Sequence, residues 1–402
     1  MQANHLRYGF AITLTMLVAC SDSSDNSAGA PTGTAASLDE IYDQGLTRYV
    51  GAFSPASETD LGNGVRRFDF ALPEDLQAEP RGPLCLRGTP YGVETRTGQS
   101  DELLIWLHEG GACWPEFCAV TEEANSIFPD GILNQSVPGN PLAEHDLVFV
   151  PYCDGSLFTG DVDRPLPPSL TGPSTVGETM SYQRGAQNLS AALDIARREF
   201  PNPSRVVLVG PSGGSFGTIV ATPLVRFYYP GIDILVIRDS GLGIVRDGDP
   251  DFINGLLRGW NADSVIPASC VDCTADGNVI NFIEWNLEND PNLYMAPMAH
   301  MQDGIIAGLF LMLDGPVYQA AVLEGTGRLA ERFPTRYKRF LQAGSNHMVI
   351  LNSGPVTPYL TGNQGSLLEE DIDGVRPIDW ISAAVQRRAD WVDTVQLDSD
   401  EQ

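Results

Sequence analysis

The feature that most constrains the fold is a glycine-rich turn at 210–214, with the sequence G-P-S-G-G. It directly follows the apolar run at 205–209, which is typical of a buried strand, and it precedes a stretch at 218–227 that is predicted to be helical. A G-x-S-x-G turn between a strand and a helix predicts that Ser212 is strained at the start of the helix, with its Oγ standing clear. The pattern therefore favours Ser212 as a nucleophile. No Lys-Ser/Thr follows the glycines, which argues against a phosphate-binding loop.

The rest of the chain alternates apolar runs with stretches at helical spacing. This alternation predicts an α/β fold of the α/β-hydrolase type, with a mostly parallel central sheet, helices on both faces and long loops over the active face. The expected strands are 103–107, 146–150, 205–209, 232–237 and 337–343, and the expected helices are 180–200, 218–227, 304–313 and 380–395. Two Pro/Gly/Asp-rich segments are expected to form loops: 155–180 and 244–290.

A serine nucleophile needs a base and an acid. In α/β-hydrolases they follow the nucleophile in the order acid, then histidine. Two histidines follow Ser212, and His347 is favoured over His300 because it comes later, just after an expected strand. The acid is Asp303 or Asp239. Spacing favours Asp303 but leaves Asp239 open, because an Asp after a strand is often only an N-cap or turn residue.

A second glycine-rich loop, H-E-G-G-A-C-W at 108–114, follows the expected strand at 103–107. In α/β-hydrolases a loop in this place supplies backbone N–H groups to the oxyanion hole. We therefore expect Gly111 and Ala112 to be oxyanion donors, together with Gly213, the residue after the nucleophile.

Three segments resemble the pectin acetylesterase/Notum family of the α/β-hydrolase superfamily. Residues 107–114 resemble its L-E-G-G-G-W-C segment, residues 152–161 (Y-C-D-G-S-L-F-T-G-D) are similar to Y-C-D-G-x-x-F-x-G-D, and 210–214 corresponds to G-x-S-A-G-G. The chain differs at 112–114, where A-C-W replaces G-W-C, at Pro211, and at Gly213, where the family usually has Ala. These differences indicate a remote bacterial member.

The resemblance implies a serine carboxylic-ester hydrolase with the triad Ser212, Asp303 and His347, and it favours Asp303 over Asp239. It also implies the disulfides Cys85–Cys153 and Cys113–Cys118, which leaves Cys270 to pair with Cys273; six cysteines beyond Cys20 fit three disulfides in an exported protein. The candidates to line the substrate pocket are Trp114, Ser156 and Phe158.

The N-terminus has the pattern of an export signal. Arg7 precedes the short apolar stretch at 10–18, which ends in the lipobox-like L-V-A-C at 17–20. We expect a lipoprotein signal peptide at 1–19, a lipid on Cys20, a flexible Ser/Gly-rich tether at 20–38 and a catalytic domain at 39–402. The protein is then exported and anchored by lipid at the outer membrane, the cell surface or the periplasmic side of a bacterial membrane.

The net charge of the chain limits the classes of molecule that it is expected to bind. The chain carries 24 Lys and Arg against 52 Asp and Glu, a formal net charge of -28, so nucleic acid is not an expected partner. The same shortage of basic residues provides no clamp for polyanionic pectin. No cofactor and no metal is expected: C-x-x-C at 270–273 has no second zinc-binding pair, and the Asp-rich run at 247–251, which hints at calcium, lacks the EF-hand pattern.

The expected function is an extracytoplasmic acyl or acetyl esterase that uses an acyl-enzyme intermediate and acts on a small acyl ester or an acylated carbohydrate. A lipase or a serine peptidase could use the same triad. An alternative of another class is a non-catalytic glycan-binding surface lipoprotein, against which the intact Ser212, His347 and candidate acid argue.

Overall fold

The computed structural model describes residues 38–77, 81–170, 177, 179–246, 249–274, 277–351 and 366–396. All of them belong to the compact unit formed by residues 36–402. The expected signal peptide at 1–19, the lipid-bearing Cys20 and the tether up to residue 37 lie outside the described residues.

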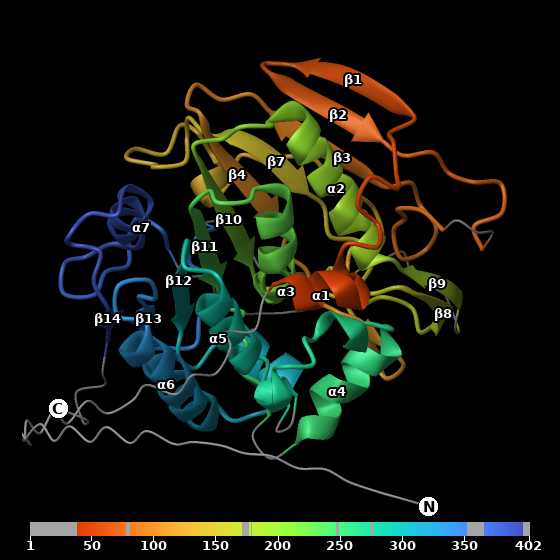
Figure 1. Cartoon of the computed structure of the whole chain (residues 1–402). Coiled ribbons are helices and arrows are strands. Elements are labelled where there is room, and N and C mark those ends of the chain that lie inside the picture. The colour runs from red at the N-terminus through yellow and green to blue at the C-terminus, as the bar shows by residue number, and fades with distance from the viewer. Residues whose placement is uncertain are drawn as a thin grey trace, which may run out of the picture. The chain divides into compact units, whose positions relative to one another are not determined.

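A mixed ten-stranded sheet organises the described residues (Figure 1). The first three strands in spatial order are antiparallel to their neighbours, and from β7 onwards all neighbours are parallel. In spatial order the strands are β1 (Ser57–Gly62), β2 (Val65–Asp69), β3 (Gly92–Arg96), β7 (Asp146–Val150), β4 (Glu102–Leu107), β10 (Arg205–Pro211), β11 (Ile234–Asp239), β12 (Leu293–His300), β13 (Phe340–Gln342) and β14 (Thr394–Val395). The mostly parallel sheet with its helices is that of an α/β-hydrolase-like fold, as predicted.

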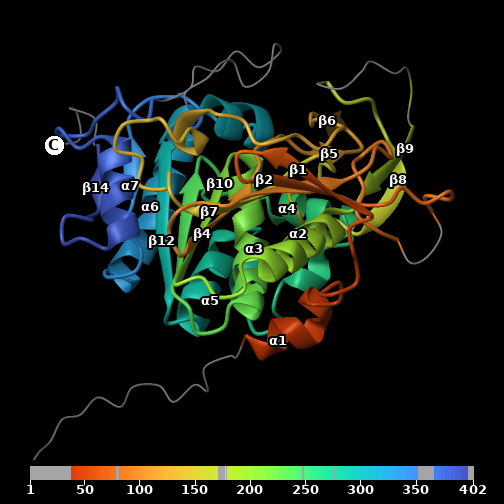
Figure 2. The same cartoon turned by 90° about the horizontal axis from the view of Figure 1, so that it is seen from above.

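Both faces of the central strands are buried, which explains why these strands are continuously apolar. In β10, Val206 and Leu208 pack into one core, whereas Val207 and Val209 pack into a second core on the opposite face. Figures 1 and 2 show the helices around the sheet. The first core contains residues of α2 (Gly185–Glu199), α3 (Gly213–Tyr228), α4 (Pro250–Gly259), α5 (Ile280–Asn289) and α6 (Gly315–Arg332), and the second contains residues of α7 (Pro377–Gln386).

The remaining elements are shorter. The described residues include β5 (Cys113–Trp114), β6 (Phe117–Cys118), β8 (Val162–Leu166), β9 (Thr179–Gln183), α1 (Asp39–Ile41), η1 (Tyr42–Leu46), η2 (Gly131–Leu133), η3 (Asp263–Val265), η4 (Val271–Cys273) and η5 (Gly304–Leu311). No single helix in the described ranges is long and apolar enough to cross a membrane; only the bent pair η5 and α6 meets that test, when the two are taken together.

The segment at 244–290 is wrongly predicted as a loop, because its polar composition hides two helices. In α4, Pro250 occupies the first turn, where its missing N–H costs no hydrogen bond. In α5, Ile280, Ile283 and Leu287 are buried at helical spacing.

Other boundaries also differ from the sequence prediction. Residues 162–166 and 179–183 form the hairpin β8–β9, so the expected loop at 155–180 contains a strand and the helix expected from 180 begins at Gly185. The helix expected at 380–395 is α7, which ends at Gln386, and residues 394–395 form the edge strand β14.

Three disulfides join the cysteine pairs that were expected: Cys85–Cys153, Cys113–Cys118 and Cys270–Cys273. The first ties the segment before β3 to the segment that comes after β7. The second closes the β5–β6 hairpin within the glycine-rich loop after β4. These bonds fit an exported protein, since disulfides persist in oxidising compartments.

Candidate active site

Ser212 lies at the turn between β10 and α3, at the carboxyl edge of the parallel strands. Its backbone has φ 51° and ψ -119°, a strained conformation for a residue with a side chain. The turn is tight because glycines flank the serine: a Cβ at Gly210 would collide with the Gly214 backbone, and a Cβ at Gly213 would collide with the Gly110 carbonyl. The sequence thus folds into the elbow that the G-x-S-x-G pattern predicts.

His347 links Ser212 to Asp303. The Nε2 atom of His347 lies 2.9 Å from the Ser212 Oγ, and its Nδ1 atom lies 2.7 Å from the Asp303 Oδ2. An ionised carboxylate can only accept hydrogen bonds, so Nδ1 carries the proton and Nε2 is left to accept the Ser212 hydroxyl proton. Ser212 is 6% exposed, and His347 and Asp303 are fully buried, so the relay is shielded from water.

Asp303 is fixed by the start of η5. Its Oδ1 accepts the backbone N–H groups of Ile305 and Ile306, at 2.9 and 3.0 Å, while Oδ2 faces His347. The residue is therefore an N-cap and the partner of the histidine at the same time. Its two oxygens have separate tasks, and this arrangement fixes the orientation of the imidazole.

The surroundings of His347 favour its charged form. Burial alone would lower the pKa of His347, but the carboxylates of Asp303, Asp239 and Glu109 together outweigh it, Asp303 most of all, so the pKa is raised from its ordinary 6.5. A base with this property readily takes a proton from a neighbouring hydroxyl.

The two alternatives from the sequence lie elsewhere. The carboxylate of Asp239 accepts the backbone N–H groups of Val349 and Ile350. The carboxylate that contacts the His347 Nδ1 atom is that of Asp303. The Nε2 atom of His300 lies 3.3 Å from the Glu370 Oε1. The structure thus brings Ser212, His347 and Asp303 together and leaves Asp239 and His300 out of the relay.

A cavity of about 200 Å³ opens beside Ser212. The expected oxyanion donors Gly111, Ala112 and Gly213 all line it. Gly213 is the first residue of α3, so its N–H has no acceptor within the helix. The other walls are mostly apolar and include Phe117, Ala119, Val120, Leu157, Phe216, Ile305, Ile306, Leu309 and Phe310.

The pocket residues expected from the sequence do not themselves line this cavity. Trp114 packs behind it, with its ring against those of Phe117 and Phe310. Ser156 is buried and donates to the Asp154 carboxylate, and Phe158 is buried against Tyr152. The residue between them, Leu157, lines the cavity instead; Leu157 and Phe158 both have positive φ values.

Sequence reasoning missed the apolar wall of the cavity. Phe216 could have indicated part of this wall, because it comes four residues after the nucleophile. A residue at this spacing lies one helical turn further along α3, on the same face. A second indication was the run G-I-I-A-G-L-F-L of η5, which has no polar face although it comes directly after Asp303.

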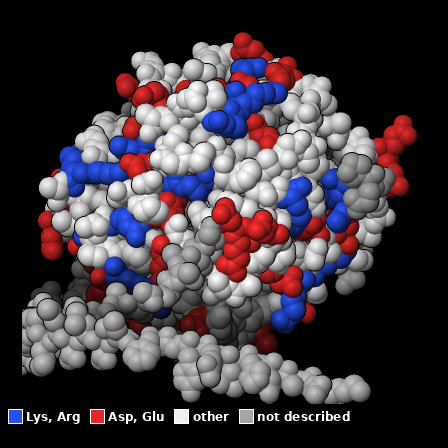
Figure 3. Space-filling model, viewed as in Figure 1, with Lys and Arg blue, Asp and Glu red and all other residues white. Residues whose placement is uncertain are grey.

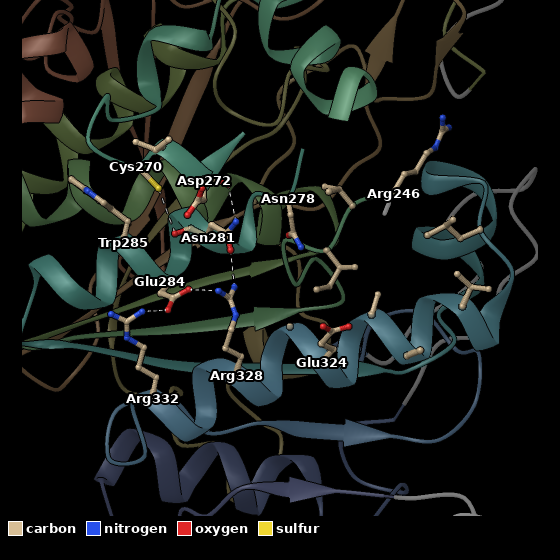
Figure 4. A pocket seen from close by; sticks show the side chains of 18 of the residues that line it. Arg246, Cys270, Asp272, Asn278, Asn281, Glu284, Trp285, Glu324, Arg328 and Arg332 are labelled. Atoms are coloured by element: carbon tan, nitrogen blue, oxygen red, sulfur yellow. Dashed lines mark hydrogen bonds and ion pairs between the residues drawn. The ribbon is translucent and has the colours of Figure 1, made fainter. Parts of the chain in front are cut away.

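A larger cavity of about 1200 Å³ lies between α5, α6 and the loop that carries the Cys270–Cys273 disulfide (Figure 4). Ser212 is not among its lining residues. Figure 4 shows that Arg328 and Arg332 both contact Glu284, and that Arg328 also donates to Asn281. These side chains satisfy each other, so the candidate site is the smaller cavity at Ser212.

The Asp-rich run that hinted at calcium is only partly described. Residues 247 and 248 lie outside the described residues, and Asp249 precedes α4 and pairs with Arg246 at 3.2 Å. In the described ranges, no group of three or more His, Cys, Asp or Glu side chains is placed to hold a metal ion.

Comparison with known families matches residues 76–248 to the model described as Pectinacetylesterase. The resemblance seen in the sequence is thereby confirmed over these residues, which include the glycine-rich loop after β4, the Y-C-D-G segment and the elbow at Ser212. The family implies an acetyl esterase, a hydrolase of carboxylic esters. No curated protein matches the chain. Asp303 and His347 lie beyond the matched residues, so their assignment depends on their contacts with Ser212 and with each other.

Proposed function

We propose, from the pectin acetylesterase match of residues 76–248 and the contacts of Ser212, that the chain is a serine carboxylic-ester hydrolase that removes small acyl groups, acetyl above all. The observation that carries the proposal is the 2.9 Å contact between the Ser212 Oγ and the His347 Nε2, made beside a cavity that Ser212 lines. The third member, Asp303, orients the imidazole and stabilises it once it is charged.

The proposed reaction has two steps. His347 takes the Ser212 proton as the Oγ attacks the ester carbonyl carbon, and the resulting oxyanion accepts hydrogen bonds from the N–H groups of Gly111, Ala112 and Gly213. The carbonyl re-forms as the alcohol leaves with the proton that His347 returns, which leaves Ser212 acylated. Water then attacks the acyl group with His347 again as base, releases the carboxylic acid and restores the serine.

The cavity supports a small acyl group. Its volume of about 200 Å³ is below the range of about 300–1,000 Å³ that is usual for sites of drug-sized ligands. Apolar walls such as Phe216, Ile305 and Leu309 suit a hydrocarbon chain and offer few partners to a peptide backbone. These walls favour an esterase over a peptidase and make a longer-chain lipase the second candidate.

The alcohol part of the substrate is proposed to be a neutral acylated carbohydrate. On the face in Figure 3, Lys and Arg side chains are scattered among Asp and Glu rather than gathered into one patch. Such a surface offers a polyanion little attraction, and the net charge of -28 adds repulsion.

A series of p-nitrophenyl esters from acetate to dodecanoate tests the proposal, with acetate release from acetylated polysaccharides measured alongside. We expect the highest kcat/KM on acetate or its near homologues and no turnover by Ser212→Ala. A maximum at long chains would replace the acetyl esterase with a lipase, and turnover by Ser212→Ala at the wild-type rate would remove the serine mechanism.

We also propose that the domain at 39–402 is exported and held by a lipid on Cys20, through the tether at 20–38. The three disulfides support export. Expression of the full chain in a bacterium with lipoprotein processing, followed by membrane fractionation, tests this. Cys20→Ala should move the protein from the membrane fraction to the soluble one, and an unchanged distribution would contradict the anchor.

A further inference from the structure

Asp239 contacts the nucleophile Ser212 and the segment that follows the base His347, although it is not part of the relay. It is the last residue of β11, pairs in register with Pro211 of β10, and is fully buried. Its main-chain carbonyl accepts the N–H of Ser212 at 2.8 Å. One end of this residue therefore fixes the backbone of the nucleophile.

The side chain of Asp239 turns the other way, to the chain just after His347. Its Oδ2 accepts the N–H groups of Val349 at 2.6 Å and Ile350 at 2.9 Å. Two consecutive amides on one carboxylate oxygen hold this part of the backbone in a single position. The same residue thus fixes the loop that carries the base.

Ser240 continues this arrangement. Its Oγ accepts the N–H of Met348 at 2.9 Å and donates to the Asp239 Oδ1 at 3.1 Å. Met348 has φ 60° and Ser240 has φ 68°, a left-handed conformation that residues with side chains seldom adopt. Met348 and Ser240, the two residues with positive φ, are thus hydrogen-bonded to each other. The backbone N–H groups of the three residues that follow His347 all donate to side chains of the dipeptide formed by Asp239 and Ser240.

We infer that Asp239 is a positioning residue that sets the distance between Ser212 and His347, holding the nucleophile through its carbonyl and the histidine loop through its carboxylate. This inference rests on the proposed function. It also explains why spacing could not separate Asp239 from Asp303: Asp239 ends β11 and Asp303 comes after β12, at the same edge of the sheet. Both serve His347, Asp303 through the ring and Asp239 through the backbone that follows it.

Asp239 also contributes charge. Three carboxylates face His347: Asp303 from the turn after β12, Asp239 from the end of β11, and Glu109 from the loop after β4, and each raises the pKa of His347 against the effect of burial. Burial raises the pKa of Asp239 itself to about 6, opposed by the amides of Ile350 and Val349. Above that pH, Asp239 carries the charge that supports a protonated His347.

The test uses the purified full domain and compares Asp239→Asn with Ser240→Ala, which removes one anchor of the same loop but leaves the charge. We expect kcat on p-nitrophenyl acetate to fall by about tenfold to a hundredfold in Asp239→Asn, the scale of a displaced catalytic group. KM should hold, because neither residue lines the cavity. The acid limb of kcat/KM should move to lower pH in Asp239→Asn and stay in place in Ser240→Ala, where kcat falls less.

Asp194→Asn is the matched control, since this carboxylate also accepts a backbone N–H, that of Gly51, at a place remote from the relay. Its kcat and acid limb should equal those of the wild type. Wild-type kcat in Asp239→Asn, or a lower kcat with an unmoved acid limb, would overturn the inference about Asp239. An inactive Ser212→Ala would uphold the proposed function in either case. If Asp239→Asn does not fold, Ser240→Ala serves as the test. Wild-type kcat in folded Ser240→Ala then overturns the inference about Asp239. Wild-type turnover by Ser212→Ala would remove the proposed function and this inference together.

Discussion

The Oγ of Ser212 and the Nε2 of His347 lie 2.9 Å apart, although 135 residues separate them in the chain. The parallel sheet brings them together across β11 and β12, because Ser212 comes after β10 and His347 comes after β13 at the same edge. Ligand and catalytic residues of open α/β sheets gather at this edge. The contact is the geometric basis of the proposed acyl transfer, and the groups that hold it can each be tested.

Asp303→Asn should lower kcat by about 10⁴-fold, the scale measured when the acid of a serine triad is replaced by its amide. The amide can still accept the N–H groups of Ile305 and Ile306, but its NH2 group cannot accept the proton of the His347 Nδ1. Steady-state hydrolysis of p-nitrophenyl acetate measures the loss. Asp314→Asn is the control, since Asp314 also precedes a helix but makes no capping bond. A loss below about tenfold for Asp303→Asn would contradict its role.

Gly213→Ala should lower kcat on the order of a hundredfold, as expected when one oxyanion donor is displaced. The family usually has Ala at this position, but here a Cβ would collide with the Gly110 carbonyl and push away the loop that carries Gly111 and Ala112. The same assay measures the loss. Gly255→Ala tests the effect of the added methyl alone, since nothing lies within 4 Å of the new Cβ in α4. Wild-type kcat in Gly213→Ala would show that this loop is not held against the elbow.

The pH dependence of kcat/KM should show an acid limb above the ordinary histidine pKa of 6.5. Catalysis needs neutral His347, and Asp303 with Asp239 and Glu109 raises its pKa against the effect of burial, so activity is lost as the pH falls through that raised value. Rates on p-nitrophenyl acetate from pH 5 to 9 locate the limb. An acid limb at or below 6.5 would contradict the balance of charges around His347.

Asp154→Asn should flatten the pH dependence of stability. Burial raises the pKa of Asp154 from 3.8 to about 7, opposed by hydrogen bonds that include one from Ser156. Between these two values the folded state keeps a proton that the unfolded state loses, so the free energy of unfolding falls as the pH rises through this window. The amide removes that titration.

Urea denaturation at several pH values from 4 to 8 measures this effect. Asp251→Asn, at an exposed position of α4, should keep the wild-type slope. Equal slopes in the wild type and Asp154→Asn would mean that Asp154 is ionised in the folded protein throughout this range.

The elbow could be predicted from the sequence because its signals are local. The apolar run that predicts a strand ends where the glycine-rich segment begins at Gly210. A strand that stops at glycines and is followed by a helix predicts a sharp turn. The partners of Ser212 were harder to assign: His347 could be chosen by chain order, whereas Asp239 and Asp303 both lie at the carboxyl edge of the sheet, one at the end of β11 and the other after β12. Only side-chain direction separates them, and that depends on the amides of residues 349 and 350, more than a hundred residues away.

The cavity wall could not be predicted for a similar reason. Leu157 lines the cavity and its neighbours Ser156 and Phe158 do not, and these residues belong to no strand whose alternation could have been followed. The apolar run of η5 reads as an ordinary core helix until its position beside Ser212 is known. Tertiary placement, and not local pattern, decides which aromatic and aliphatic side chains meet the substrate.

The central claim is that the Ser212 Oγ becomes covalently acylated, and labelling with diisopropyl fluorophosphate followed by peptide mass spectrometry tests it most directly. We predict one phosphoryl adduct per chain, on Ser212, formed in step with the loss of esterase activity and absent from Ser212→Ala. An adduct on another residue that tracks the loss of activity, or full activity in a chain labelled on Ser212, would contradict the account.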